Sequence, residues 1–132
     1  MRGVVSFTVV VVLLLALAFP AVAEEVDFTL GRFVTCQRIE DREPVGITTT
    51  FPEDTVKVYA FIEALDIAKE TGIKIEWLFE DKQAAIIELT LGQSKRWRTY
   101  SSKRIGIRHG SWEVRLLDSQ DNLLSSLAFT VN

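Results

Sequence analysis

The sequence predicts an all-β protein, an antiparallel β-sandwich of seven or eight strands behind a signal peptide. Apolar and polar residues alternate in short runs along most of the chain, which is typical of strands with one buried face. Turn-rich gaps separate these runs, without an internal repeat, a low-complexity segment or a linker. The N-terminus differs, because it is a continuous apolar run. Together these observations predict one exported domain in which two sheets pack around one core.

The first 23 residues have the layout of a cleavable secretory signal. Arg2 supplies a positive charge, residues 9–19 are uninterrupted apolar, and Ala21-Val22-Ala23 is a small-x-small exit. An uncleaved anchor is the alternative, since about 20 apolar residues span a bilayer. Cleavage is favoured because Pro20 breaks a helix just before the exit. We therefore expect a periplasmic or extracellular domain of residues 24–132, with membrane contact only if the N-terminal segment is uncleaved.

Composition limits the partners and the chemistry. The chain has 15 basic and 18 acidic side chains, and loss of Arg2 with the signal makes the mature chain more acidic. No nucleic-acid partner is therefore expected. Because Cys36 and His109 are the only cysteine and histidine, an ordinary Cys/His zinc site is excluded and we expect no metal or cofactor.

The two single residues have ordinary interpretations. Cys36 is expected to be a small buried side chain on a strand, with a disulfide-linked dimer or a reactive thiol as the alternative. His109 precedes Gly110 and is expected in a turn. A Cys36 and His109 catalytic dyad is the competing hypothesis.

The strands are expected near residues 27–36, 45–51, 55–63, 73–80, 84–92, 95–101, 111–117 and 124–131. In the first strand, Phe28 and Leu30 share one parity and Phe33 has the other, which predicts a bulge near Gly31 if all three face inward. The core is expected to be built on Trp77, Ile87, Trp97, Trp112 and Phe129.

A helix competes with a strand only in the stretch AFIEALDIAKETG. Glu63, Ala64 and Leu65 favour helix, and Gly72 is a suitable residue to end one. The sequence predicts a strand through Phe61, followed by a helical turn.

The strands predicted between residues 73 and 92 form a hairpin. If both apolar faces point to one core, an odd loop such as Asp81-Lys82-Gln83 is required. That register places Glu76 opposite Glu88 on the outer face. A carboxylate pair there is a candidate for cation binding or acid–base chemistry, but an open sheet lacks the enclosed pocket that such chemistry needs. We interpret both as surface charges.

The stretch KRWRTYSSKRIGIRHGSW, residues 95–112, has six basic residues and no acidic one. Strand parity puts Trp97 toward the core and its neighbours on the outer face. It also predicts that Ile105 and Ile107 point in one direction and the adjacent arginines in the other. The alternative to a binding surface is a solvated wall whose arginines protect strand edges, partly neutralised by Glu113 beside Arg115. The candidate binding patch comprises Arg96, Arg98, Tyr100, Lys103, Arg104 and Arg108.

These residues also carry a resemblance. The segments Arg96-Trp97-Arg98-Thr99, Ser101-Ser102-Lys103, Gly110-Ser111-Trp112-Glu113-Val114, and Asp118 through Leu123 to Phe129-Thr130-Val131 resemble the bacterial family called domain of unknown function 2914. The similarity extends from about Val34 to Val131. It implies an immunoglobulin-like module of unassigned function, often attached to membrane-associated proteins, and it supplies no catalytic residues. Members tend to have a histidine two places before the fourth-strand tryptophan, where this chain has Ile75.

The expected function is non-catalytic: an exported accessory or binding module that contacts an acidic protein or an anionic envelope polymer through the basic outer face of a sheet. Two alternatives stay open. One is an acid–base hydrolase that uses surface carboxylates, and the other is a structural module that pairs through a free sheet edge. The sequence does not predict an oligomeric state.

Overall fold

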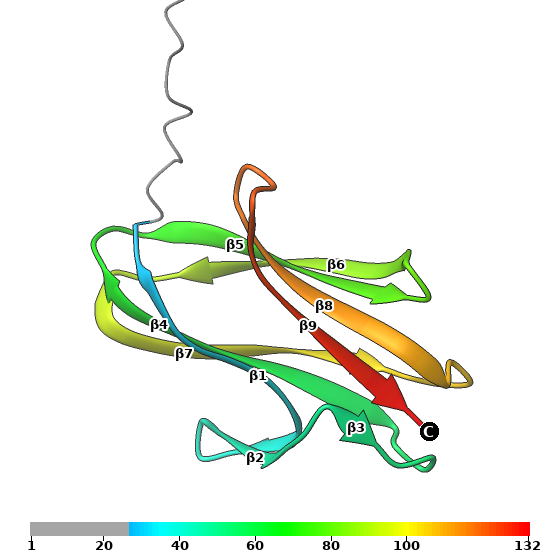
Figure 1. The fold of residues 1–132 in the computed structure, drawn as a ribbon. Coiled ribbons are helices and arrows are strands. Elements are labelled where there is room, and N and C mark those ends of the chain that lie inside the picture. Colours follow the sequence, from blue (N-terminus) through cyan, green and yellow to red (C-terminus); the bar gives the residue numbers. More distant parts are fainter. Residues whose placement is uncertain (1–26) are drawn as a thin grey trace, which may run out of the picture.

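The computed structural model describes residues 27–132, which form nine strands (Figure 1). They are β1 Thr29–Glu40, β2 Glu43–Ile47, β3 Thr50–Phe51, β4 Lys57–Ile67, β5 Thr71–Phe79, β6 Lys82–Leu91, β7 Ser94–Arg104, β8 Gly110–Asp118 and β9 Leu123–Val131. The predicted signal peptide lies outside the described residues. Within residues 27–132, no helix is long and apolar enough to cross a membrane.

The strands form two sheets in a sandwich-like, all-β arrangement (Figure 1). One has the order β2-β1-β4-β7 and the other β3-β9-β8-β5-β6. The predicted count of seven or eight was too low, because the strand expected at 45–51 divides into β2 and β3, which join different sheets. The pairing of β3 with β9 is parallel, so the wholly antiparallel prediction was wrong at this edge.

The core lies between the sheets and consists of side chains on alternate strand positions. Trp77, Trp112 and Phe129 are almost fully buried, as predicted, and the ring of Phe129 packs against both indoles. The indole Nε1 of Trp77 donates a hydrogen bond of 3.2 Å to Ser101 Oγ on the opposite sheet. This bond satisfies a buried polar group of each sheet and fixes how β5 sits over β7.

Trp97 does not belong to the buried core, although it has the predicted parity. Its relative exposure is 37%, because it lies near the start of β7, where Gly92 is the residue beside its ring. A β-carbon at Gly92 would lie only 2.7 Å from the indole. The absence of a side chain at Gly92 therefore makes room for the indole, which stays partly exposed to solvent.

Two local predictions have different outcomes. The bulge near Gly31 is confirmed, since the pairing of β1 with β4 shifts between Leu30 and Arg32. The helical turn after Phe61 was wrong, because β4 continues to Ile67. β4 is bonded along its length to β1 and to β7, and this pairing on both sides outweighs the helix propensity of its residues.

The hairpin of β5 and β6 has a tighter turn than predicted. Glu80 and Asp81 both have positive φ, 48° and 65°, which is the backbone of a two-residue type I′ turn. A bulge after Trp77 then restores the inward parity. Glu76 consequently lies opposite Ile86, and Glu88 lies opposite Lys74. The predicted Glu76 and Glu88 pair was wrong by two residues of register.

The β1–β2 hairpin, residues 36–47, determines the shape of the other sheet's outer face. A two-residue turn at Asp41 and Arg42, with φ of 49° and 62°, reverses the chain. Figure 1 shows β2 outside the layer of β1, β4 and β7. Phe61 points to this outer face and yet is only 1% exposed. The hairpin therefore gives the sheet a second, smaller buried zone on its outer side.

Candidate functional site

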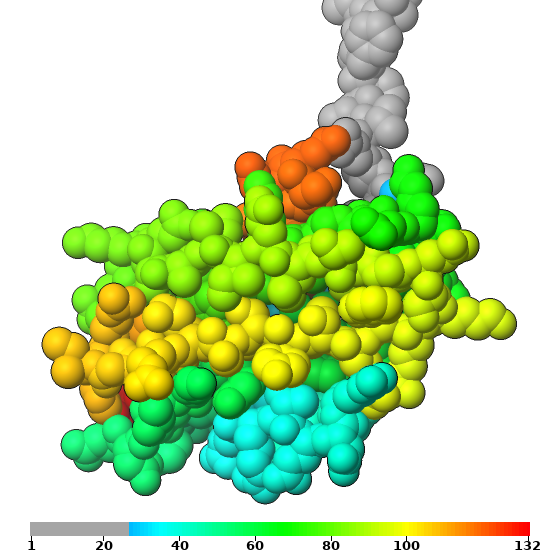
Figure 2. All heavy atoms as spheres, turned by 180° about the vertical axis from the view of Figure 1, so that it is seen from behind, coloured from blue at the N-terminus to red at the C-terminus, as the bar shows by residue number. Residues whose placement is uncertain are grey.

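The predicted patch lies mainly on β7, the edge strand of the four-stranded sheet. Figure 2 shows β7 in yellow, with the β1–β2 hairpin in cyan beside it. The predicted alternation is confirmed in this strand, because Ser101 is buried toward the core and Tyr100 is 49% exposed on the outer face. The six patch residues do not form one surface, however. They divide into a group at residues 96–100 and a group at residues 103–108.

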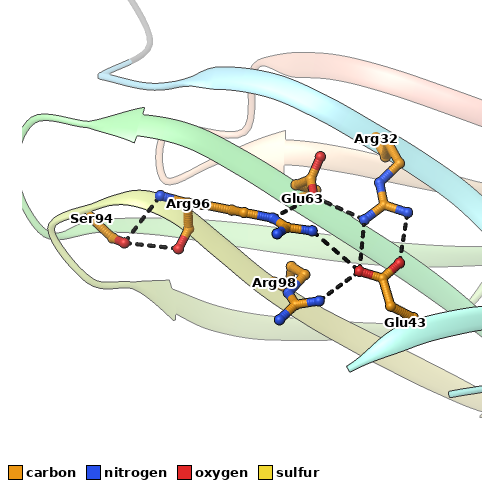
Figure 3. A network of polar contacts seen from close by, with 6 residues as sticks. All are labelled: Arg32, Glu43, Glu63, Ser94, Arg96 and Arg98. Carbon is orange, nitrogen blue, oxygen red and sulfur yellow. Dashed lines mark hydrogen bonds and ion pairs between the residues drawn. The ribbon is translucent and has the colours of Figure 1, made fainter. Parts of the chain in front are cut away.

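In the first group, Arg96 and Arg98 are already engaged with carboxylates (Figure 3). Glu43 on β2 accepts hydrogen bonds from Arg98 Nη1 at 2.5 Å and from Arg96 Nη2 at 3.2 Å. Glu63 on β4 accepts one from Arg96 Nε at 2.9 Å. Arg32 on β1 bridges both carboxylates, with Nη1 2.9 Å from Glu43 and Nη2 2.8 Å from Glu63. We call these five residues the arginine–glutamate network.

The network holds its carboxylates in the ionised form. Hydrogen bonds from Arg32 and Arg98 lower the pKa of Glu43 to about 2. The Arg32 hydrogen bond also lowers the pKa of Glu63, helped by Arg96 and opposed by burial. The same bonds to Glu43 and Glu63 raise the pKa of Arg32. Three guanidinium groups thus surround two carboxylates, so the network has one positive charge in excess near neutral pH.

Strands that are distant in sequence supply the network. Pairing of β4 with β1 and β7 places Glu63 opposite both Arg32 and Arg98. The Asp41-Arg42 turn then folds Glu43 back over the same face (Figure 3). The sequence analysis missed Arg32, Glu43 and Glu63. Of the three, only Glu63 has a signal in the sequence, since it is an acidic residue between the apolar residues 60–62 and 64–65.

The second group has no comparable partners. Within residues 27–132, Lys103, Arg104 and Arg108 make no ion pair. Burial and the nearby Arg108 lower the pKa of Lys103. Arg104 lies directly opposite Lys57 of β4, another cation. This end of β7 is therefore electrostatically unfavourable for its own side chains.

The turn after β7 differs from its prediction. Ile105 is buried and Ile107 is 95% exposed, so the two side chains do not share an environment. The strand ends at Arg104, and a tight turn follows in which Arg108 N donates to Ile105 O. Because parity holds only within a strand, it does not predict directions in this turn.

A groove lies between β7 and the tip of the β1–β2 hairpin. It consists of two neighbouring hollows of about 370 Å³ each. Arg42 and Arg98 line both hollows. Tyr100 lines one of them, and its ring is tilted against that of Tyr59, with 5.8 Å between the ring centroids. We call this the β7 groove; its lining comprises Ile39, Asp41, Arg42, Phe61, Arg96, Trp97, Arg98, Thr99 and Tyr100.

The arginines of the β7 groove keep unused hydrogen-bond donors. Arg98 uses only Nη1 and Arg96 only Nε and Nη2 within the described residues. A guanidinium has five N–H donors, so each retains donors for a carboxylate or phosphate oxygen. Arg42, which the sequence analysis missed, makes no ion pair in residues 27–132 and is exposed. The lining of the groove therefore contains three arginines and one carboxylate, Asp41, while Glu43 and Glu63 beside it pair with Arg96 and Arg98.

The remaining candidates stand apart from this groove. Cys36 is buried, as predicted, and burial raises the pKa of its thiol. His109 lies in the loop before β8, as predicted, and its Nδ1 contacts the carbonyl oxygen of Asn132. No contact joins Cys36 and His109, so the structure gives no dyad. Across residues 27–132, no three His, Cys, Asp or Glu side chains are grouped to hold a metal ion.

Glu76 has a structural role on the outer face of the other sheet. Its Oε1 lies 3.6 Å from Arg115 Nη1, and Arg115 also bonds Glu113. The predicted pairing of Glu113 with Arg115 is confirmed, but both lie on β8, away from the β7 groove. They do not neutralise the patch. Glu43 and Glu63 do this instead.

One family model matches the chain. It is described as protein of unknown function (DUF2914) and matches residues 70–131. The matched range contains β5 to β9 and hence the whole candidate patch, whereas the β1–β2 hairpin precedes it. No curated protein matches the chain.

Proposed function

We propose that this chain, which belongs to the DUF2914 family, is a non-catalytic binding module that holds an anionic partner in the β7 groove. The observation that carries the proposal is the set of three arginines around the groove, with donors that the fold itself leaves unused. The apolar floor and the Tyr100 ring add contact area beside these charges.

The arginine–glutamate network supports binding by fixing the arginines in place. Arg98 has a side-chain exposure of only 24%, and Glu43 holds its guanidinium at one end. A fixed guanidinium loses little side-chain entropy when a ligand arrives, so a carboxylate oxygen can be bound at low cost. The carboxylates thus position the arginines and leave part of their charge available.

The proposal includes an exported setting and an immunoglobulin-like arrangement of the sandwich, both of which follow from the sequence analysis. In such a compartment the partner is an acidic protein or an anionic envelope polymer. Intact-mass measurement of exported protein that begins at Glu24 supports the setting, and retention of residues 1–23 contradicts it.

The test uses Arg42, because it lines the groove without contributing to the network. Reversal of Arg96 and Arg98 is unsuitable, since it removes the partners of Glu43 and Glu63 and disturbs the fold. Two fluorescent probes are used, an oligoglutamate peptide and an oligogalacturonate, at low salt. We expect Arg42→Glu to weaken binding of at least one probe by about tenfold, as for loss of a charge contact that remains unscreened.

Lys82→Glu is the matched control, since Lys82 is an exposed cation on β6 of the other sheet. It changes the net charge equally and is expected to bind like the unmodified chain. Equal binding by both variants, or binding that is unchanged at high salt, contradicts the proposal. The unfolding midpoints of both variants check that the fold is intact.

A further inference from the structure

The edge of β7 is an unused strand-pairing surface. β4 pairs with β7 along its whole length, from Lys57↔Arg104 to Ile67↔Ser94, and no described residue pairs with its other side. The strand has 11 residues, without proline and without a register shift against β4. Strand edges in soluble proteins are usually shortened, bulged or interrupted. The β7 edge has none of these devices, and charged side chains are its only protection against pairing.

The β7 groove lies on the outer face of the sheet, on the side of β7 that pairs with β4, because Phe61 of β4 lines it. Five consecutive residues, Arg96 to Tyr100, line it, although successive side chains of a strand point to opposite faces. The groove therefore runs along β7, and β7 itself separates it from the unpaired edge. The hairpin tip with Asp41 and Arg42 forms its other wall (Figure 2). An extended segment added at the unpaired edge would lie alongside β7 on its other side, with the outward side chains of β7 between the segment and the groove.

The charges define what such a segment can be. β7 contains Lys95, Arg96, Arg98, Lys103 and Arg104 and no acidic residue. A second copy that paired through β7 would place cations against cations, which is destabilising. A segment with carboxylates at alternate positions would instead place them beside Arg96 and Arg98, which share the outer face of β7.

We infer that the partner is a protein with an extended acidic segment, which adds to the edge of β7 as a further strand of the four-stranded sheet. The inference rests on the proposed anion-binding function and specifies its partner. Backbone hydrogen bonds supply the affinity, and the arginines select carboxylates at alternate positions. The same cations repel the β7 strand of a second copy. Attraction of an acidic strand and repulsion of a basic one therefore both select the acidic partner.

The test separates backbone pairing from charge. The probe is a fluorescein-labelled peptide of alternating glutamate and threonine, with two derivatives that are N-methylated on alternate amides. One derivative is methylated on the glutamates and the other on the threonines. All three peptides have the same charge. A peptide that adds as a strand pairs through the amides of one side only, so one derivative should lose about tenfold or more in affinity while the other binds like the parent.

A second measurement uses the protein backbone. Amide hydrogen exchange should slow in residues of β7 when the peptide is bound and should stay unchanged in β6, the edge strand of the other sheet. If both methylated peptides bind like the parent, or if exchange in β7 is unchanged, strand addition is wrong and simple anion binding stands. If oligogalacturonate binds and the peptide does not, the partner is a polymer and the inference is overturned. If neither probe binds, the proposed function fails as well.

Discussion

The two halves of strand β7 have similar composition and opposite electrostatic states. Near its start, Arg96 and Arg98 lie within hydrogen-bond distance of Glu43 and Glu63 (Figure 3). Near its end, Lys103 and Arg104 have no ion pair within the described residues, and Arg104 lies opposite Lys57. The cations of the first half are therefore paired with carboxylates. The cations of the second half are without an ion pair among the described residues, and only solvent reduces their mutual repulsion.

This difference teaches that a run of basic residues does not define a charged surface. What the cations face depends on the strands that fold against them. At the start of β7 the β1–β2 hairpin adds Glu43 over the sheet, and β4 contributes Glu63. At the end of β7, β4 contributes Lys57 instead. In the first half, only the unused guanidinium donors are thus available to a partner. In the second half, the whole cationic side chains are available.

The largest expected effect concerns two tryptophans, Trp97 near the start of β7 and Trp112, which contacts the turn after the end of β7. Trp112 is 2% exposed, and its Nε1 donates to Arg108 O at 2.8 Å, which holds the turn that follows β7. Trp112→Ala should lower the free energy of unfolding by about 3 to 5 kcal/mol, since it leaves a large cavity. Trp97→Ala should cost about 1 to 2 kcal/mol, because its ring is already partly solvated. Chemical denaturation measures both, and equal losses would contradict the asymmetry.

The next effect tests whether the network stabilises the first half. Glu63 has a side-chain exposure of 12% and accepts bonds from Arg32 and Arg96. Glu63→Ala should lower the free energy of unfolding by about 2 kcal/mol, as for the loss of hydrogen bonds between charged groups. The control is Glu113→Ala, which breaks the more exposed pair with Arg115 and should cost about 0.5 kcal/mol. If the two losses are equal, the network is no stronger than an ordinary surface pair.

The sequence predicted the strand pattern well, because alternation records which face each side chain occupies. It predicted the buried Trp77, Trp112 and Phe129, the bulge at Gly31 and the outward direction of Arg96 and Arg98. It did not predict their partners, since Glu43 and Glu63 reach them only through long-range pairing of β1, β4 and β7. The helical turn after Phe61 was wrong for the same reason, as local propensity contains no information on a neighbouring strand. The sequence also did not predict the exposure of Trp97, because this depends on the contact of its indole with Gly92, a residue outside β7.

The pH dependence should come mainly from the first half. The arginines lower the folded-state pKa of Glu43 from 4.5 to about 2 and also lower that of Glu63. A depressed carboxyl pKa contributes stability that is fully present above the unfolded-state pKa and is lost as pH falls through the folded value. The thermal midpoint should therefore fall as pH decreases from about 4.5 to about 2. Glu43→Gln should flatten this part of the curve, whereas Lys103→Gln at the other end should leave its slope unchanged.

The smallest effect has the opposite sign and lies at the end of β7. Arg104→Glu converts a cross-strand pair of cations with Lys57 into a pair of opposite charges, which should raise the free energy of unfolding by about 0.5 kcal/mol. Arg98→Glu makes the same change of charge in the same strand, but it brings a third carboxylate to Glu43 and Glu63 and must destabilise. Added salt screens exposed charges, so it should reduce the gain from Arg104→Glu toward zero. Denaturation of both variants at low and high salt measures these signs. Two losses of equal size would mean that the charges at the two ends of β7 do not differ in their surroundings, and the division of the strand would be wrong.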